Sequence, residues 1–417
     1  MTSRLRVTNY IVILFLVGCA PLAPLLSTPT PAPVAESTPT PQVTPTSTPS
    51  SQVDPNVLRI WLPPQFDPSA ETASAGLLNQ RLKDFESDHP GLTIDVRIKN
   101  NIVDFLTTTY RAAPDAMPDL VALSYNQMQT AASDGFLHPL DGLTDIMQDS
   151  DWYVSARELS SVQNVGYGIP FAIDAQVMVY RPSVFDDPPS NWEAILSSGA
   201  QLAFPASDLL HYFPLSLYLS AGGQLKDADG AINLDEEILA SVLSVYQQAY
   251  EAGLIPINIR DFQTDLDVLG TYRGGETDLV FVWASSDLGI NSGNYATLLG
   301  LDDTPYSVSK GWAWVFAGVN ADNQSLAIEL ASYLVESEYL SKWTKAAGYL
   351  PTRPLALESW ENESVKNSMD DVLLAAHPAP APDVMSVFGP LMQEALIRIF
   401  DGEQAEAVAR SVIENLK

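Results

Sequence analysis

The sequence predicts an α/β protein built from two lobes. Short apolar segments with period-two alternation are interspersed with longer segments that carry apolar residues at helical spacing. This succession begins near residue 58 and restarts near residue 176. Roughly 360 residues follow a proline-rich segment, which is more than one typical hydrophobic core. A β-α-β-α-β order predicts parallel strands covered by helices.

The first half of the folded region supplies that order. Leu58, Ile60 and Leu62 alternate along one strand, and Leu78, Leu82 and Phe85 form the apolar stripe of the helix that follows. In chain order we expect a strand at 58–62, a helix around 78–85 stopped by 89–91, a strand at 92–98, a helix around 102–110 and a strand at 119–123.

The second half repeats the pattern with longer helices. A strong apolar stripe between Leu239 and Tyr250 predicts a helix ended by Gly253. We further expect strands at 176–180, 279–283 and 312–319, a helix from about 325 to 337, and two helices over 384–416 separated at 401–402.

The N-terminus predicts export and a lipid anchor. Arg4 and Arg6 precede an apolar run at 10–17, which is far shorter than the ~20 residues of a membrane-spanning helix. This arrangement is typical of a signal peptide, predicted over 1–18. Leu16-Val17-Gly18-Cys19 resembles a bacterial lipobox, so Cys19, the single cysteine, is the predicted lipidation site. An ordinary signal peptide with an incidental cysteine is the alternative.

Residues 19–56 are predicted to form a lipidated cysteine followed by a tether. The segment 21–55 is dominated by proline, threonine and serine, with almost nothing to bury. Proline-rich linkers extend by ~3 Å per residue, so the folded region could stand up to ~100 Å from a membrane. We therefore expect an extracytoplasmic protein on the outer face of a bacterial cell membrane.

Composition excludes several function classes. The net charge of −30 repels nucleic acid and anionic lipid surfaces. The four histidines are far apart, without metal-ligand spacing, and the chain carries no nucleotide-binding or G-x-S-x-G motif. We therefore expect no cofactor, no metal and no nucleic-acid partner.

From about 57 to 416 the chain resembles the extracellular solute-binding proteins of family 1, the sugar-binding subunits of ABC importers. The resemblance rests on several weak pieces in the family's order rather than on one signature. The pieces include LRIWLPPQ, LNQRLKDFESDHPGLTIDV, PDLVALSYNQMQTAASDGFLHPL, GYGIPFAIDAQVMVYRPSVFDDPPSNWEAI, YRGGETDLVFVW, KGWAWVFAGVN and GYLPTRP.

The resemblance implies a periplasmic-binding-protein-like fold. Each lobe would be a mainly parallel sheet flanked by helices, and the ligand cleft would lie at a multi-strand hinge. The expected N-terminal lobe comprises 57–172 and about 305–355, and the C-terminal lobe comprises 173–304 and about 356–417. Open α/β sheets independently favour ligand sites beyond the carboxyl ends of their strands. A monomer is expected.

Aromatic side chains at strand ends are the first candidates for the site, since flat rings suit the apolar faces of a sugar. Trp283, Trp312 and Phe388 match positions where the family stacks sugar rings. Phe66, Tyr125 and Tyr212 are further candidates at strand ends. For each ring the alternative is a place in the core. Trp61 is assigned to the core, and Trp312 is preferred over Trp314.

Polar candidates complete the predicted site. Asp174 matches a position where sugar-binding relatives keep an acid, and the alternative is a hinge acid that caps a nearby turn. Gln65 and Asn126 match polar contact positions, or serve ordinary turn chemistry. Arg353 is expected to pin the hinge.

The resulting functional prediction is a non-catalytic lipoprotein that captures a neutral mono- or oligosaccharide and delivers it to an ABC transporter permease. Two alternatives stay open. One is a surface-anchored carbohydrate-active enzyme, which would need two facing carboxyl groups. The other is a sugar sensor or adhesion module without a transport role.

Overall fold

The computed structural model describes residues 56–210, 212–318 and 321–416, all of which belong to one compact unit that begins at Ser51. The predicted signal peptide, Cys19 and nearly all of the proline-rich tether lie outside the described residues. None of the helices in the described part is both long and apolar enough to cross a bilayer.

Nine strands form one continuous sheet in the order β2-β1-β3-β10-β6-β8-β7, with β11 beside β10 and β9 beside β6. Strands β4 and β5 form a separate small hairpin. The strands are β1 (Val57–Leu62), β2 (Thr93–Ile98), β3 (Leu120–Ser124), β4 (Ser161–Val162), β5 (Val165–Gly166), β6 (Gly168–Tyr180), β7 (Leu202–Ala203), β8 (Leu279–Trp283), β9 (Asn294–Ala296), β10 (Ser307–Phe316) and β11 (Ala376–Pro378).

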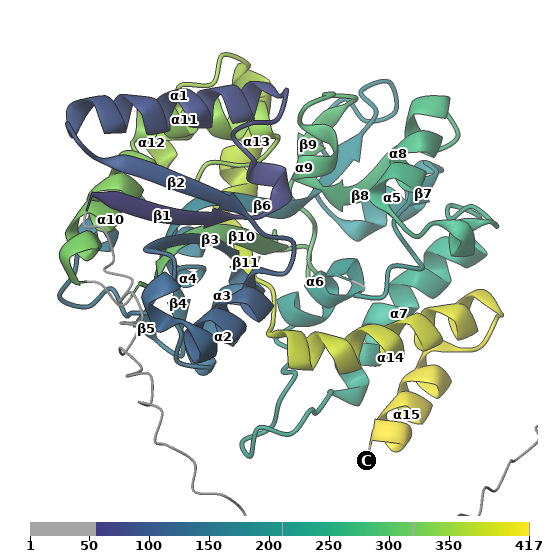
Figure 1. The fold of residues 1–417 in the computed structure, drawn as a ribbon. Helices are drawn as coiled ribbons and strands as arrows, with labels where there is room; N and C mark the ends of the chain where they lie inside the picture. The colour runs from purple at the N-terminus through teal and green to yellow at the C-terminus, as the bar shows by residue number, and fades with distance from the viewer. Residues whose placement is uncertain (1–55, 211, 319–320, 417) are drawn as a thin grey trace, which may run out of the picture. The chain divides into compact units, whose positions relative to one another are not determined.

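Helices cover both faces of this sheet (Figure 1). They are α1 (Ala73–Asp88), α2 (Ile102–Ala112), α3 (Tyr125–Ser133), α4 (Val154–Glu158), α5 (Trp192–Ser198), α6 (Tyr212–Ser220), α7 (Glu236–Glu251), α8 (Asp265–Gly274), α9 (Ala284–Asp287), α10 (Ala321–Tyr333), α11 (Ser337–Ala347), α12 (Pro354–Glu358), α13 (Glu363–Leu374), α14 (Pro382–Phe400) and α15 (Ala405–Leu416). The α/β class and the two helices at the C-terminal end are confirmed.

The sheet is mixed, which corrects the expectation of mainly parallel lobes. The outer strands are parallel, β1 with β2 and β3, and β7 with β8. The central strand β10 is antiparallel to both β3 and β6, and β6 is antiparallel to β8. The β-α-β pattern predicted the parallel strands correctly. The pattern could not predict the antiparallel pairing of β6 and β10, the two crossing strands that both lobes share, because their partners are far away in the sequence.

Strand β6 joins the two lobes of the fold. Its first part, Gly168–Ala175, pairs with β10, whereas Gln176–Tyr180 pairs with β8. Strand β10 is shared in the same way, because Trp312–Phe316 pairs with β3 while Ser307–Ser309 pairs with β11. The lobe boundaries expected from the sequence, 172/173 and about 304/305, stay a prediction.

Strand β1 shows how the first lobe is packed. Leu58, Ile60 and Leu62 are buried on one face in the same core cluster as the apolar stripe of α1. Trp61 points to the other face, is 3% exposed, and packs with residues of α2 and α3. Figure 1 shows α1 on one side of β1 and the helices α2 and α3 on the other. The prediction that Trp61 lies in the core is confirmed.

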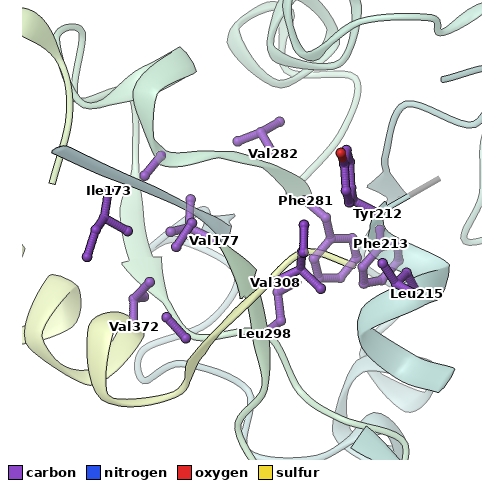
Figure 2. Close-up of a cluster of buried hydrophobic side chains, with 14 of the residues drawn as sticks. Ile173, Val177, Tyr212, Phe213, Leu215, Phe281, Val282, Leu298, Val308 and Val372 are labelled. Carbon is purple, nitrogen blue, oxygen red and sulfur yellow. The ribbon is translucent and has the colours of Figure 1, made fainter. Parts of the chain in front are cut away.

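The second lobe is built on an aromatic stack. Phe213 of α6 lies parallel to Phe281 of β8, with ring centroids 4.1 Å apart. Figure 2 shows this pair together with Ile173 and Val177, two of the buried side chains of β6. The crossing strand is therefore part of the core, so the two lobes share one hydrophobic core cluster.

Two predicted elements are displaced along the chain. The strand expected at 312–319 is β10, which begins at Ser307, and the helix expected at 325–337 is α10, which begins at Ala321. Ser307 and Ser309 are fully buried in the sheet. Serine is a weak strand former and Lys310 is charged, so the first half of β10 was not predicted from the sequence.

The close contact between β6 and β10 at Gly311 can be tested by substitution. A Cβ atom at this position would lie 2.9 Å from the carbonyl oxygen of Ala172 and 2.9 Å from Leu159 Cδ1. Gly311→Ala should therefore lower the free energy of unfolding by ~1–3 kcal/mol, measured by urea denaturation. Gly270→Ala is the control, since open space surrounds Gly270 within α8 and alanine favours a helix by ~1 kcal/mol. Equal stabilities for the two variants would contradict this packing.

Candidate ligand-binding site

Aromatic rings of the first lobe gather at the end of β1. Phe66 follows this strand in a short 3-10 turn (Pro64–Phe66), and its ring meets Trp312 edge to face with centroids 5.0 Å apart. Tyr349 lies 6.1 Å from Phe66 on the same side. Phe66 is 4% exposed, whereas Trp312 and Tyr349 are partly exposed. Phe66 therefore supports Trp312, which offers the more accessible ring.

The second lobe presents a matching pair. Trp283 ends β8 and is partly exposed, and Tyr212 at the start of α6 meets it edge to face with ring centroids 5.1 Å apart. Tyr212 is 7% exposed. Burial, together with the nearby Asp208 carboxylate, raises the pKa of Tyr212 to about 12, so the hydroxyl stays protonated at neutral pH. Trp283 is thus held by a neutral phenol ring.

Asp174 lies in β6 close to the point where this strand changes partners. Its Oδ1 accepts the Ser285 backbone N–H at 3.0 Å, and its Oδ2 accepts the Ser285 hydroxyl at 2.6 Å. The residue is 1% exposed. Asp174 therefore caps the start of α9, which agrees with the structural alternative raised for this acid. Its role as a ligand contact stays a prediction.

Lys310 is the cationic partner of Asp174. The two residues face each other across the antiparallel pair β10–β6, and the Lys310 Nζ lies 3.4 Å from Asp174 Oδ2. The same ammonium lies 3.7 Å from the centroid of the Trp283 ring, in a cation–π contact. The lysine side chain is 45% exposed. One lysine thus joins the buried acid to the accessible tryptophan.

Two further acids surround this lysine. Asp265 Oδ2 accepts the Trp283 backbone N–H at 2.9 Å and the Ser286 hydroxyl at 2.6 Å. Burial raises the pKa of Asp265, and the negative charge of Asp174 raises it further. The hydrogen bonds from Ser286 and Trp283 and the positive charge of Lys310 lower this pKa and so act against burial. Burial likewise raises the pKa of Asp208, against the attraction of Lys310.

The Tyr349 hydroxyl is influenced by residues of both crossing strands. Burial and the Asp174 carboxylate raise the pKa of Tyr349 to about 12, while a hydrogen bond with the Trp312 side chain acts in the opposite direction. Direct contacts thus join Phe66 to Trp312 in the first lobe. A second series joins Asp174 through Lys310 and Trp283 to Tyr212.

The remaining predicted contacts on the first lobe directly follow its strands. Ser124, the last residue of β3, pairs with Trp312, and Tyr125 and Asn126 come next, at the start of α3. Both are partly exposed, and Gln65 is exposed next to Phe66. Burial raises the pKa of the Tyr125 hydroxyl. These positions are consistent with ligand contacts, which stay predictions.

Phe388 does not join the site, contrary to the sequence-based hypothesis for this ring. It lies in α14, is fully buried, and packs near Tyr218 with ring centroids 6.1 Å apart. A ring without an exposed face cannot stack on a ligand in this state. Trp314 is also buried and stacks on Phe171 at 4.6 Å, in contrast to the partly exposed Trp312.

Arg353 lies in a separate ionic cluster. Its Nε donates to Asp151 at 2.9 Å, and its guanidinium also pairs with Asp149 and lies 4.8 Å from the Trp152 ring centroid. The side chain is 11% exposed. Arg353 is therefore occupied by structural contacts.

A groove of about 490 Å³ runs between α3 and the start of α14. Gln129 and Thr130 line it from the first lobe, and Lys226, Pro382 and Asp383 line it from the second. None of the predicted site residues lines this groove, although Gln129 and Thr130 belong to α3, which begins at Tyr125.

Four residues of the site were not predicted from the sequence, namely Lys310, Tyr349, Asp208 and Asp265. A signal existed for Lys310, which is the only charge in the apolar segment SVSKGWAWVF and has the same strand parity as Trp312. The local sequence indicates that Asp265 is an ordinary acid in the first turn of a helix and that Asp208 is a turn residue. Nothing local distinguishes them.

A two-lobed α/β fold with aromatic and charged side chains around two crossing strands defines a ligand-binding protein. The chain belongs to the bacterial extracellular solute-binding protein family, whose model matches residues 80–370. Its family and its structural neighbours are binding proteins.

Individual relatives agree with this assignment. A Brucella abortus protein named only as a binding protein is 21% identical over 337 residues, which is 74% of this chain and 79% of the relative. The mannitol-binding protein of Pseudomonas aeruginosa is 29% identical over 125 residues, 28% of this chain and 29% of that protein. The sugar-binding protein MalE of Xanthomonas citri has a similar fold, with a TM-score of 0.72 at 17% identity, over 86% of this chain and 96% of that one.

Asp265 provides a test of the electrostatics. A carboxyl whose pKa is raised by folding opposes folding when it is ionised, and this penalty is relieved as the pH falls toward the raised pKa. Asparagine can accept the same two hydrogen bonds without the charge. The stability of Asp265→Asn relative to wild type, measured by urea denaturation, should therefore be greater at pH 7 than at pH 5.

Asp267→Asn in the same helix is the matched control. Hydrogen bonds from Thr264 and Gln263 lower the pKa of Asp267, so it is ionised in both the folded and the unfolded state across this range. Its effect on stability should stay constant from pH 7 to pH 5. A constant effect for Asp265→Asn as well would argue against the buried charge.

Proposed function

We propose that the protein binds a neutral carbohydrate or polyol between its lobes and delivers it to the permease of an ABC importer. In this proposal a lipid on Cys19 tethers it to the outer face of the bacterial membrane. The observation that carries the proposal is a pair of partly exposed tryptophans near the Asp174–Lys310 ion pair. Trp283 contacts the Lys310 ammonium, and Trp312 lies two positions from Lys310 along β10.

This arrangement suits the chemistry of a sugar. Pyranose rings have apolar C–H faces that stack on indole, and hydroxyl rims that need both donors and acceptors. Lys310 supplies donors, while the carboxylates and the tyrosine hydroxyls supply acceptors. The names of a mannitol-binding relative and a sugar-binding structural neighbour support the same ligand class.

A carbohydrate-active enzyme is the weaker alternative. Asp174 and Asp265 are two acids near Trp283, but both bind the start of α9 through backbone and serine donors. A glycosidase needs one carboxyl that donates a proton and a second that faces it across the bond to be cleaved. Two acids whose oxygens are engaged in hydrogen bonds to a helix fit a binding protein better than a glycosidase. A sensor without transport would share this site and differ only in its partner.

Ligand binding is tested by a thermal-shift screen of neutral sugars and polyols, followed by calorimetric titration of the hits. A ligand at 100 times its Kd should stabilise the protein by ~2.7 kcal/mol. Trp283→Ala should weaken binding of a hit by ~10–100-fold, or ~1.4–2.8 kcal/mol, through loss of the stacking face.

Phe388→Leu is the control for that substitution, because Phe388 is buried away from the site. This variant should melt at a lower temperature yet retain its affinity. If Phe388→Leu loses affinity and Trp283→Ala does not, the site is wrongly placed. If no neutral sugar or polyol in a broad panel stabilises the protein, the carbohydrate proposal fails.

Membrane attachment is tested by Cys19→Ser in the full-length chain, expressed in a bacterium that processes lipoproteins. The wild-type protein should fractionate with membranes, because a thioether-linked lipid anchors it. The variant should be released into the soluble extracytoplasmic fraction after a high-salt wash, as judged by immunoblot. Retention of Cys19→Ser on the membrane would contradict the lipid anchor.

A further inference from the structure

The accessible ring of Trp283 is already occupied. The Lys310 ammonium lies 3.7 Å from the ring centroid, and Tyr212 contacts the same indole edge to face. A sugar cannot stack on the ring position that the ammonium covers. Stacking on the face that the ammonium covers therefore requires Lys310 to move.

Three carboxylates favour a cation at this place. Asp174 Oδ2 is 3.4 Å from Nζ, and Asp208 and Asp265 interact with the ammonium at longer range. Asp174 is 1% exposed, so its charge depends on nearby partners rather than on water. Ser285 supplies two of these partners, and Lys310 supplies the only positive one that the described contacts show.

Lys310 is nevertheless able to move. Its side chain is 45% exposed and consists of a flexible four-carbon stem, so the ammonium can leave the ring and still reach Asp174. Of the three protons on Nζ, those not directed to Asp174 would then be available to a ligand.

We propose that Lys310 is a specificity-determining residue, whose ammonium holds the ligand's place on Trp283 and, once displaced, donates to the hydroxyl groups of a neutral ligand. The displaced ammonium stays beside the bound ligand, so a ligand that carries its own ammonium group would place two cations together. A ligand with a carboxylate would face Asp174, Asp208 and Asp265. This inference rests on the proposed function for its ligand class, but the ammonium position itself can be tested without any sugar.

The first experiment uses Lys310→Ala with n-butylammonium, which has the four carbons and the ammonium of a whole lysine side chain. The free cation should bind the vacated position, raise the melting temperature of Lys310→Ala and change its tryptophan fluorescence saturably at millimolar concentration. The wild-type protein should show neither response, since its own lysine fills the position. Lys310→Ser serves in the same way if the alanine variant fails to fold.

Two controls identify the position. Butan-1-ol, which has the same chain without the charge, should leave Lys310→Ala unchanged. The double variant Lys310→Ala/Trp283→Leu should lose the response to butylammonium. An equal response of wild type, an equal effect of butanol, or no response of Lys310→Ala and Lys310→Ser would each overturn the proposal that the ammonium is held on Trp283.

The second experiment tests selectivity with matched probes, glucose against glucosamine and sorbitol against glucamine, by calorimetric titration at pH 6. Wild type should bind the neutral member of a pair at least tenfold more tightly than the amine. Lys310→Met should lose most of that preference, because the competing cation is gone. An unchanged preference in Lys310→Met would show that Lys310 does not determine specificity.

The two experiments separate this proposal from the proposed function. If none of the four probes binds wild type or Lys310→Met, the result counts against the carbohydrate assignment, and the butylammonium titration alone decides whether Lys310 occupies Trp283. If a neutral probe binds wild type but butylammonium has no effect on the variants, the carbohydrate assignment stands and the role of Lys310 is refuted.

Discussion

The buried carboxylate of Asp174 is the interaction on which the site depends. It lies in β6, the strand that pairs with β10 on one side of this residue and with β8 beyond it. Its two oxygens hold Ser285 at the start of α9, and its charge is balanced by Lys310 from the facing strand. An unpaired buried carboxylate is costly, so these contacts specify one relative placement of β6, β10 and α9.

That placement brings the aromatic residues of both lobes to the crossing strands. Trp283 directly precedes α9, and Trp312 follows Lys310 by two positions along β10. Since alternate residues of a strand share a face, the lysine and Trp312 project to the same side of the sheet. The polar centre and the two rings are therefore consequences of one strand pairing, and a ligand that touches both rings would contact both lobes. Proteins with this architecture can change the population of open and closed states on binding.

The charge distribution restricts what such a site can bind. The chain carries a net charge of −30, and the site places one lysine among three aspartates. Burial raises the pKa of two of these acids, Asp208 and Asp265, and the attraction of Lys310 opposes this shift. A neutral, hydroxyl-rich molecule binds here with the smallest electrostatic penalty, because it can accept hydrogen bonds from the ammonium and donate hydrogen bonds to the carboxylates without adding a charge.

The sequence by itself determined the α/β class, the parallel outer strands, most helices, the core position of Trp61 and the solute-binding family. Each of these depends on local periodicity or on ordered sequence similarity. Only the tertiary structure decided that β10 is antiparallel to both β3 and β6, that Phe388 is buried, and that Lys310 lies between Asp174 and Trp283. Asp174 and Lys310 are far apart in the sequence, and neither a strand partner nor the exposed face of a ring is encoded in a local pattern. Those features follow from long-range pairing and burial, which exist only once the chain has folded.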